Sequence, residues 1–316
     1  MKKQWISVLL AVALVCTLAA CAGKGEGSSN PDEQADFPVT VRDADIADAP
    51  EKIVSLSPGT TEMLFAMGYG SRVTGVSEYC DTPREEVAKR QKCGSAMQPQ
   101  LRIITSLAPD LVVTAAPLQE IDLIQLQQAD IPVLVLPYAD SLEGLQKNYL
   151  DLACAVQGKV TGAAAGDSFW QEMEALLSEA KALSADSTPL TAILLWEMSY
   201  GMATGDTFEG QLLEEIGFVN DAKRFSNWLY DKEEVAALEP DVIFADNSIT
   251  ESEIKDSSVY KPVQAVLNDR ILNVDLAAFE RQSPRMFETL LQMAEFAYGG
   301  EAADDQGDAS GSTAGD

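Results

Sequence analysis

The chain has 316 residues, a formal net charge of −28 at pH 7 and no histidine. So acidic a surface repels phosphate backbones, which argues against a nucleic-acid partner. Without imidazole, the chain can assemble neither a Ser-His-Asp or Cys-His nucleophilic site nor an imidazole-based zinc site, and no pair of carboxylates stands out as catalytic. We therefore expect a protein that is not an enzyme.

Residues 1–20 have the pattern of a secretory signal peptide. Lys2 and Lys3 precede an apolar run of sixteen residues, 5–20, whereas a membrane-spanning helix needs about 20. The run closes on Leu-Ala-Ala-Cys at 18–21, the pattern at which a signal peptidase cleaves before a cysteine that receives a lipid. We predict that lipid on Cys21 anchors the exported protein to the outer face of the cell membrane. A chance cysteine at a small-residue cleavage site is the alternative.

Polar segments flank the predicted folded body. Residues 21–37 are rich in glycine and serine and are predicted to form a flexible tether behind the lipid. Residues 300–316 are predicted to form a disordered acidic tail. The roughly 260 residues between them are many for a single core and suit two lobes.

Residues 38–158 are predicted to form an N-terminal α/β lobe, because short apolar runs alternate with helical patterns. Ser57 and Pro58 open the first predicted helix, where serine can cap it and proline can take the first helical position. A second helix is predicted at 120–128. The predicted strands are 53–56, 73–76, 111–114 and 133–136. This alternation of strand and helix implies a parallel sheet with helices on its faces.

Three cysteines lie in the predicted body. Cys80 and Cys93 enclose a polar, turn-rich segment, and an exported protein can keep such a pair oxidised. We predict a Cys80–Cys93 disulfide, with two free thiols as the alternative. Cys154 lies in an apolar helical pattern and is predicted to be a buried helix residue.

The second half repeats the same alternation after one long helical pattern. Residues 159–185 carry apolar side chains at helical spacing without an internal proline, and we predict one helix that joins the two lobes. An ordinary helix on the face of one lobe is the alternative. Residues 186–299 are predicted to form a C-terminal α/β lobe, with strands at 192–196, 241–245 and 271–274 and a helix at 210–216. The predicted fold is two Rossmann-like lobes with mainly parallel sheets, joined by one long α-helix.

Several segments of the chain resemble a known family. Residues 53–58, Thr61-Glu62, Gly75-Val76 and 79–83 resemble the opening of the helix-hinged substrate-binding proteins of ABC importers for cobalamin, ferric siderophores and haem. Residues 279–285 resemble a segment of the cobalamin-binding member, and the resemblance extends from about 51 to 297. It implies a metal chelate held in a cleft between the lobes and delivered to a membrane permease.

The resemblance also implies site residues. In the family, one surface glutamate on each lobe pairs with permease arginines. Glu233 matches that position in the C-terminal lobe, whereas Arg102 occupies the matching position in the N-terminal lobe. Four residues match positions that line the ligand pocket in the family: Tyr79, Met202, Trp228 and Arg281. Aromatic faces suit a macrocycle, and a guanidinium can take a carboxylate or amide oxygen, although these aromatic residues could equally pack in a core.

The ligand stays open at this point. The aspartate and tryptophan of the cobalamin-binding member are Ala277 and Ala278 here. We expect a corrinoid first, then a ferric siderophore or haem. The expected partners are this chelate, an ABC permease with its ATPase, and the membrane; the protein would be a monomer without a cofactor of its own. The alternatives are a receptor for an amino acid, sugar or peptide, which would have several extended hinge strands, and a non-transport surface sensor without a cleft.

Overall fold

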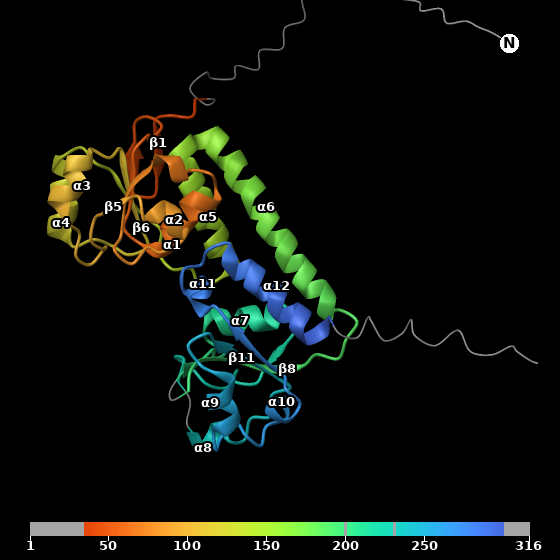
Figure 1. Ribbon diagram of the computed structural model, residues 1–316. Helices are drawn as coiled ribbons and strands as arrows, with labels where there is room; N and C mark the ends of the chain where they lie inside the picture. Colours follow the sequence, from red (N-terminus) through yellow and green to blue (C-terminus); the bar gives the residue numbers. More distant parts are fainter. Residues whose placement is uncertain (1–34, 199–200, 230–231, 300–316) are drawn as a thin grey trace, which may run out of the picture. The chain divides into compact units, whose positions relative to one another are not determined.

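The protein is described by a computed structural model, which covers residues 35–198, 201–229 and 232–299 (Figure 1). The predicted signal peptide, the lipidation at Cys21 and the acidic tail lie outside these residues. So does the side chain of Glu233, whose backbone belongs to helix α8 (Lys232–Val235).

The N-terminal lobe is built on a parallel five-stranded sheet with the strand order β5-β4-β3-β6-β7. All four predicted strands are confirmed, and β5 is an additional strand of two residues. The strands are β3 (Ile53–Ser55), β4 (Val73–Val76), β5 (Gln91–Lys92), β6 (Leu111–Thr114) and β7 (Val133–Val135). An antiparallel hairpin, β1 (Val39–Val41) and β2 (Ala44–Ile46), precedes the sheet.

Helices cover both faces of this sheet, and the strands are buried on both sides as parallel strands usually are. Val54 and Val112 point into one apolar cluster, which also contains Ile104 and Leu126 of the helices beside it. The alternate strand residues, such as Ile53, point into a second cluster on the opposite face. The helices of this lobe are α1 (Pro58–Ala66), η2 (Gly70–Arg72), α2 (Arg84–Val87), α3 (Leu101–Leu107), α4 (Glu120–Gln128) and α5 (Leu142–Gln157).

The C-terminal lobe has a second sheet with the strand order β10-β8-β11-β12 in parallel, and β9 pairs antiparallel with β8. The three predicted strands are confirmed. The strands are β8 (Thr191–Glu197), β9 (Gly201–Met202), β10 (Val219–Asn220), β11 (Val242–Asp246) and β12 (Ile271–Val274). The short β9 and β10 carry no periodic pattern and were not predicted. The helices are α7 (Phe208–Glu215), α8, α9 (Glu251–Asp256), α10 (Gln264–Leu267), α11 (Leu276–Glu280) and α12 (Arg285–Tyr298).

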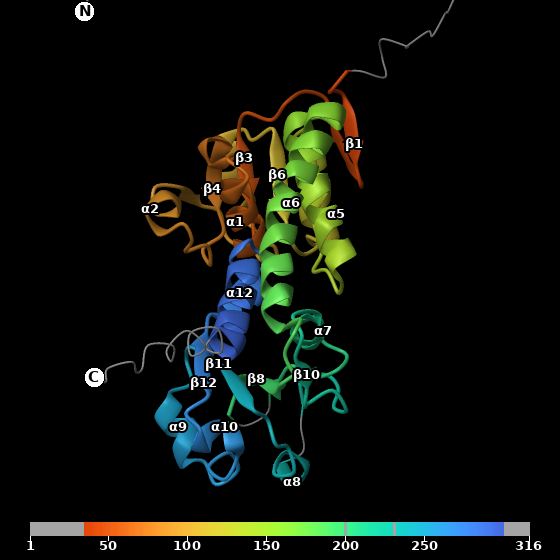
Figure 2. The same cartoon turned by 90° about the vertical axis from the view of Figure 1, so that its right-hand side faces the viewer.

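The predicted long helix is confirmed as α6, Lys159–Ser184, with 26 residues. It is not the only helix between the lobes, because α12 runs beside it in both views (Figures 1 and 2). Trp170 of α6 meets Phe287 of α12 edge to face, with 5.6 Å between ring centroids. One apolar cluster extends from the N-terminal sheet through these two helices to Leu194 and Phe244 of the C-terminal sheet. The lobes are therefore joined by a packed pair of helices.

The predicted Cys80–Cys93 disulfide is wrong, because both residues are free, buried thiols in the structure. The two side chains belong to different apolar clusters, Cys80 with Val76 and Cys93 with Val54. Cys80 Sγ lies 3.1 Å from Thr61 Oγ1, and burial raises the pKa of the Cys93 thiol to about 11. Cys154 is a helix residue as predicted, on α5, but only half-buried.

No helix in the described part of the chain is both long enough and apolar enough to cross a membrane.

Candidate functional site

The site lies where the sheet topology leaves an opening. In parallel sheets, ligands bind beyond the carboxyl ends of the strands, at the point where the strand order reverses. In the N-terminal sheet this point lies between β3 and β6. Ser57 follows β3, and its Oγ accepts a hydrogen bond of 2.9 Å from the backbone N–H of Ala115, which follows β6. Ser57 is the residue before α1 as predicted, but its side chain caps no helix N–H because it makes this bond.

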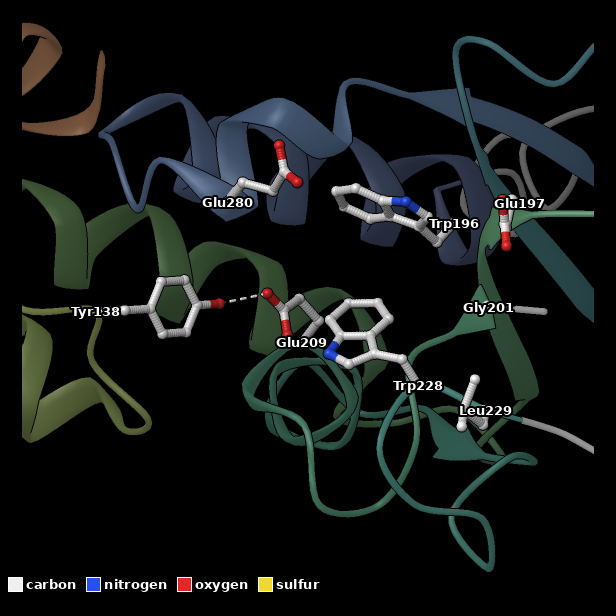
Figure 3. A pocket seen from close by; sticks show the side chains of 8 residues that line it. All are labelled: Tyr138, Trp196, Glu197, Gly201, Glu209, Trp228, Leu229 and Glu280. Carbon is white, nitrogen blue, oxygen red and sulfur yellow. Dashed lines mark hydrogen bonds between the residues drawn. The ribbon is translucent and has the colours of Figure 1, made fainter. Parts of the chain in front are cut away.

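Two adjacent cavities occupy this region. The tryptophan cavity has a volume of about 510 Å³ and is lined by Tyr138, Trp196, Glu197, Gly201, Glu209, Trp228, Leu229 and Glu280 (Figure 3). The Ser57 cavity has a volume of about 430 Å³ and is lined by Ser57, Pro58, Gly59, Thr60, Met63, Tyr79, Ala115, Leu136, Tyr138, Leu145, Asn148, Glu280, Arg281 and Gln282. Tyr138 and Glu280 line both. Residues of both lobes therefore contribute to one composite site, with volumes in the range of ligand pockets.

A pair of indoles forms one wall of the tryptophan cavity. Trp196 precedes the last residue of β8, and its ring lies 5.7 Å from that of Trp228 at an interplanar angle of 70°. Trp228 has a φ of 62°, which is rare for a bulky residue, and it follows Asn227 with a φ of 59°. This backbone is held in place: Trp228 N–H donates to Thr204 Oγ1, and its carbonyl accepts from Met202 N–H. Unusual backbone held by its surroundings is typical of ligand-binding loops.

A hydrogen bond crosses the site between the two lobes. Tyr138, in the loop after β7, donates its phenolic O–H to Glu209 Oε1 of α7 at 2.5 Å (Figure 3). The Glu209 side chain is only 4% exposed. Burial raises the pKa of the Glu209 carboxyl, although the hydrogen bond from Tyr138 partly opposes this shift. Partial burial and the neighbouring Glu209 carboxylate raise the pKa of the Tyr138 phenol, which therefore stays a donor.

Two further carboxylates border the tryptophan cavity. Glu197 ends β8, and Glu280 ends α11. Partial burial raises the pKa of the Glu280 carboxyl, while the adjacent Arg281 lowers it. Among the described residues that line this cavity, three are glutamates and none is a lysine or arginine. The cavity thus combines apolar aromatic faces with negative charge.

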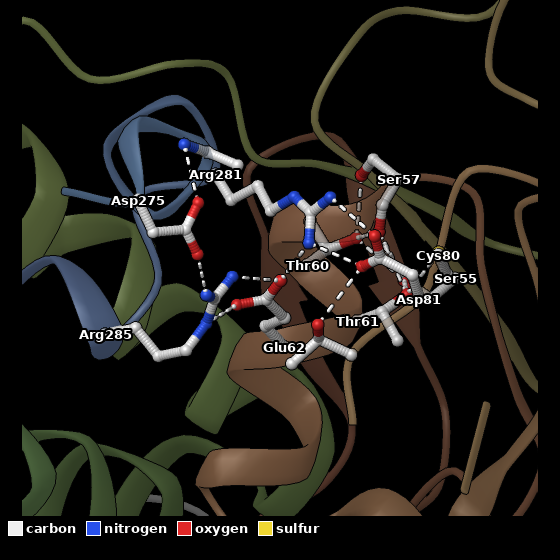
Figure 4. Close-up of polar contacts among 12 residues, drawn as sticks. Ser55, Ser57, Thr60, Thr61, Glu62, Cys80, Asp81, Asp275, Arg281 and Arg285 are labelled. Carbon is white, nitrogen blue, oxygen red and sulfur yellow. Dashed lines mark hydrogen bonds and ion pairs between the residues drawn. The ribbon is translucent and has the colours of Figure 1, made fainter. Parts of the chain in front are cut away.

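The Ser57 cavity is bordered by an ion-pair network centred on Glu62 of α1 (Figure 4). The Glu62 side chain is only 4% exposed and accepts hydrogen bonds from Arg281 at 2.7 Å and from Arg285 at 3.0 Å. Arg281 also contacts both oxygens of Asp81, at 2.6 and 3.2 Å, and Arg285 pairs with Asp275. The network therefore ties the segment around α11 to the N-terminal lobe.

Backbone contacts reinforce this attachment. Gln282 is buried, and its side-chain amide makes two hydrogen bonds with the backbone of Ala139, accepting from N–H at 2.8 Å and donating to the carbonyl at 2.6 Å. Tyr149 Oη donates to the carbonyl of Gln282 at 3.0 Å. A Cβ on Gly59 would lie 2.3 Å from the carbonyl oxygen of Arg281, so only glycine permits this approach. The start of α1 and the end of α11 are therefore in close backbone contact at Gly59 and Arg281.

The four pocket residues predicted from the sequence have different positions. Tyr79 and Arg281 line the Ser57 cavity, and Trp228 lines the tryptophan cavity. The prediction that Met202 lines the pocket is wrong. Its side chain is fully buried in the apolar cluster of the C-terminal lobe, because β9 directs it into the core. The guanidinium of Arg281 is occupied by Glu62 and Asp81, so it differs from the ligand-facing group that was expected.

The predicted docking residues lie away from these cavities. Arg102 is exposed near the start of α3, beside a shallow hollow that Gln100 and Asp122 also line. The backbone of Glu233 lies in α8, and its side chain is outside the described residues.

Sequence reasoning missed Tyr138, Trp196, Glu197, Glu209 and Glu280. Trp196 and Glu197 could have been found, because Trp196 ends the predicted strand 192–196, Glu197 follows it, and parallel strands present ligand residues at their carboxyl ends. Tyr138 and Glu209 lie 71 positions apart in the sequence, and their pairing depends on how the two lobes meet. No local pattern could have indicated it.

Comparison with known proteins identifies similar chains. The sequence model of the family described as periplasmic binding protein matches residues 53–275. An ABC transporter substrate-binding lipoprotein of Bacillus subtilis is 29% identical over 313 residues, which cover 94% of this chain and 98% of that protein. A cobalamin-binding protein of Halobacterium salinarum is 25% identical over 321 residues, with 93% and 85% covered.

A solved structure shares the fold. A possible iron-binding, periplasmic solute-binding protein of Staphylococcus epidermidis is similar with a TM-score of 0.66 and 20% identity, over 79% of this chain and 100% of that chain. At this identity the similarity supports the two-lobed architecture with its long helix.

Proposed function

Because this chain belongs to the periplasmic binding protein family, we propose that it captures a metal chelate between its lobes and delivers it to an ABC permease with its ATPase. A corrinoid is the first candidate ligand, followed by a ferric siderophore and haem. The observation that carries the proposal is the composite site, in which two adjacent cavities of about 510 and 430 Å³ combine Trp196, Trp228 and Tyr138. Large rigid aromatic faces suit the apolar surface of a macrocycle or chelate.

The linkage between the lobes favours this class of ligand over an amino acid, sugar or peptide. Receptors for those solutes were expected to have several extended hinge strands, whereas α6 and α12 form a packed helical link here. A stiff link suits a ligand that fills a preformed opening. The named ligand of the Halobacterium salinarum relative, cobalamin, supports the order of candidates.

The test is a titration of the full chain, purified in mild detergent, with cyanocobalamin, a ferric catecholate, a ferric hydroxamate and haemin. Tryptophan fluorescence and calorimetry report binding independently. We expect saturable binding of at least one chelate at micromolar concentration or below. Amino acids, sugars and a short peptide serve as controls, and binding of one of these in place of every chelate would contradict the proposal.

We further propose that lipid on Cys21 anchors the protein outside the cell membrane, in line with the Bacillus subtilis lipoprotein relative. Mass spectrometry of the membrane-extracted protein would show a diacylglyceryl group on Cys21. Cys21→Ala should release the protein from the membrane fraction without changing its affinity for a chelate. Membrane retention of this variant would contradict the anchor.

Docking on the permease is proposed to use Glu233 and Arg102. Glu233→Arg should leave chelate affinity unchanged but lower both transport and the stimulation of the permease ATPase by about tenfold, because it reverses a charge at the contact. Arg102→Glu tests the N-terminal lobe in the same assay. Glu179→Arg, at an exposed position of α6, is the control for charge reversal. Equal effects of all three variants would contradict the assignment.

A further inference from the structure

We infer that the tryptophan cavity receives a cationic or N–H-rich part of the chelate, and that this receptor excludes chelates with an anionic group at that place. The inference rests on the proposed function and specifies the chemical class of its ligand. It starts from the charges around the cavity. Glu197, Glu209 and Glu280 line it, and no lysine or arginine does so among the described residues.

The nearest guanidiniums do not supply the missing positive charge. Arg281 follows Glu280 in the chain but turns toward the Ser57 cavity, where it contacts Glu62 at 2.7 Å and Asp81 at 2.6 Å (Figure 4). Arg285 is bonded to the same Glu62 and to Asp275. This network holds three carboxylates and two guanidiniums, so it carries no positive charge in excess that an anionic ligand could use.

Two described basic side chains of the C-terminal lobe, Lys223 and Arg224, also have acidic partners. Lys223 Nζ lies 2.7 Å from a carboxylate oxygen of Glu214. Arg224 interacts with Glu234 through a long ion pair and donates to its backbone carbonyl at 3.0 Å. Among the described residues that line the cavity, an anionic ligand group would therefore lie beside carboxylates without a lysine or arginine as countercharge.

The aromatic wall favours the same class of ligand. The rings of Trp196 and Trp228 meet edge to face, which leaves π faces available beside the carboxylates. Cations bind to the faces of indole more strongly than to other aromatic side chains, and the interaction strengthens in a partly dehydrated site. Carboxylate oxygens accept hydrogen bonds from amide N–H groups as well as from ammonium groups. A neutral corrinoid with many amide groups and a cationic ferric hydroxamate both meet these requirements, whereas haem and a ferric catecholate are anionic.

The experiment varies charge within one ligand framework. The full chain in mild detergent is titrated with three ferric trihydroxamates that differ only in the pendant group: an ammonium (ferrioxamine B), its neutral N-acetyl form and its anionic N-succinyl form. A corrinoid series runs in parallel, with aquacyanocobinamide, cyanocobalamin and a cyanocobalamin monocarboxylate. Within the framework that binds, we expect the dissociation constant to rise about threefold to tenfold from the cationic to the anionic member. Glu197 and Glu280 are exposed in the chelate-free chain, so water weakens their interaction with the ligand charge until the bound chelate displaces part of it.

Variants locate the origin of the preference. Glu197→Gln and Glu280→Gln, alone and together, should reduce the ratio of the dissociation constant of the anionic member to that of the cationic member toward one. Each substitution removes a negative charge from the cavity and keeps the size of the side chain. Glu179→Gln, which removes an exposed charge on α6, should leave the ratio unchanged. Thermal unfolding of each variant checks that it is folded.

The outcomes separate the inference from the proposed function. Equal or tighter binding of the anionic members would overturn the inference and leave the chelate receptor standing. A charge preference that is undiminished in the double variant would also overturn it, because Glu197 and Glu280 would then contribute nothing to the preference. Binding by no member of either series, or of the wider chelate panel, would remove the proposed function together with the inference.

Discussion

The two cavities of the site differ in how their polar groups are used. Around the Ser57 cavity, Arg281, Glu62 and Gln282 bond to other protein groups, and these bonds attach the α11 segment to the N-terminal lobe. In the tryptophan cavity, Glu197 and Glu280 have no lysine or arginine among the described lining residues. We therefore expect the groups around the first cavity mainly to hold the lobes in place, and those of the second to meet a ligand. Substitutions in the ion-pair network beside the Ser57 cavity should therefore lower stability, and substitutions in the tryptophan cavity should lower the affinity for the ligand.

The largest effect is expected from Glu62→Ala. It leaves two partly buried guanidiniums without their shared carboxylate, and the free energy of unfolding should fall by about 2–3 kcal/mol. Chemical denaturation measures this. Glu86→Ala, which removes surface ion pairs with Lys89 and Arg90, is the control and should cost about 1 kcal/mol or less. Equal effects of the two variants would show that the network does not hold the lobes.

Trp228→Ala should affect binding more than stability. It removes one indole from the tryptophan cavity, and the affinity for the bound chelate should fall by about 30-fold. Calorimetric titration measures the change. Trp170→Phe, in the core between α6 and α12, is the control that should retain affinity even if the protein becomes less stable. Retained affinity in Trp228→Ala would move the ligand out of this cavity.

Tyr79→Ala tests the other cavity with the same type of side chain. Tyr79 is 64% exposed, so its contact with a ligand is largely solvated, and the affinity should fall by only about threefold. The same titration gives the value. A loss of affinity equal to that of Trp228→Ala would mean that both cavities contribute equally to recognition, and it would contradict the assignment of ligand binding mainly to the tryptophan cavity.

The smallest effect concerns pH. Burial raises the pKa of Glu209 above its unfolded value of about 4.3. The contribution of this carboxyl to stability is therefore fully present below pH 4.3 and is lost as the pH rises through its folded pKa. Glu209→Gln should remove this dependence, so its melting temperature relative to wild type should be about 2 °C higher at pH 7 than at pH 4. An offset independent of pH would contradict the shift.

The sequence predicted the fold well, because parallel strands buried on both faces are continuous apolar runs; β3, β6, β8 and β11 were found in this way. The short β9 and β10 pair mainly through the backbone and have no such signal. The site was predicted less well. Trp228 and Tyr79 line cavities, but Met202 faces the core and the guanidinium of Arg281 is occupied by protein carboxylates. These outcomes depend on strand orientation and on contacts between distant segments, such as Glu62 and Arg281, which local sequence does not encode.

We propose that the ligand of this protein lies against the tryptophan pair. The most direct measurement is a crystal structure of the full chain with the chelate that binds most tightly in the titrations. We expect the chelate to contact Trp196 and Trp228, with a cationic or N–H donor group facing Glu197 and Glu280. A chelate bound outside the tryptophan cavity, or one that places an anionic group against these carboxylates, would contradict it.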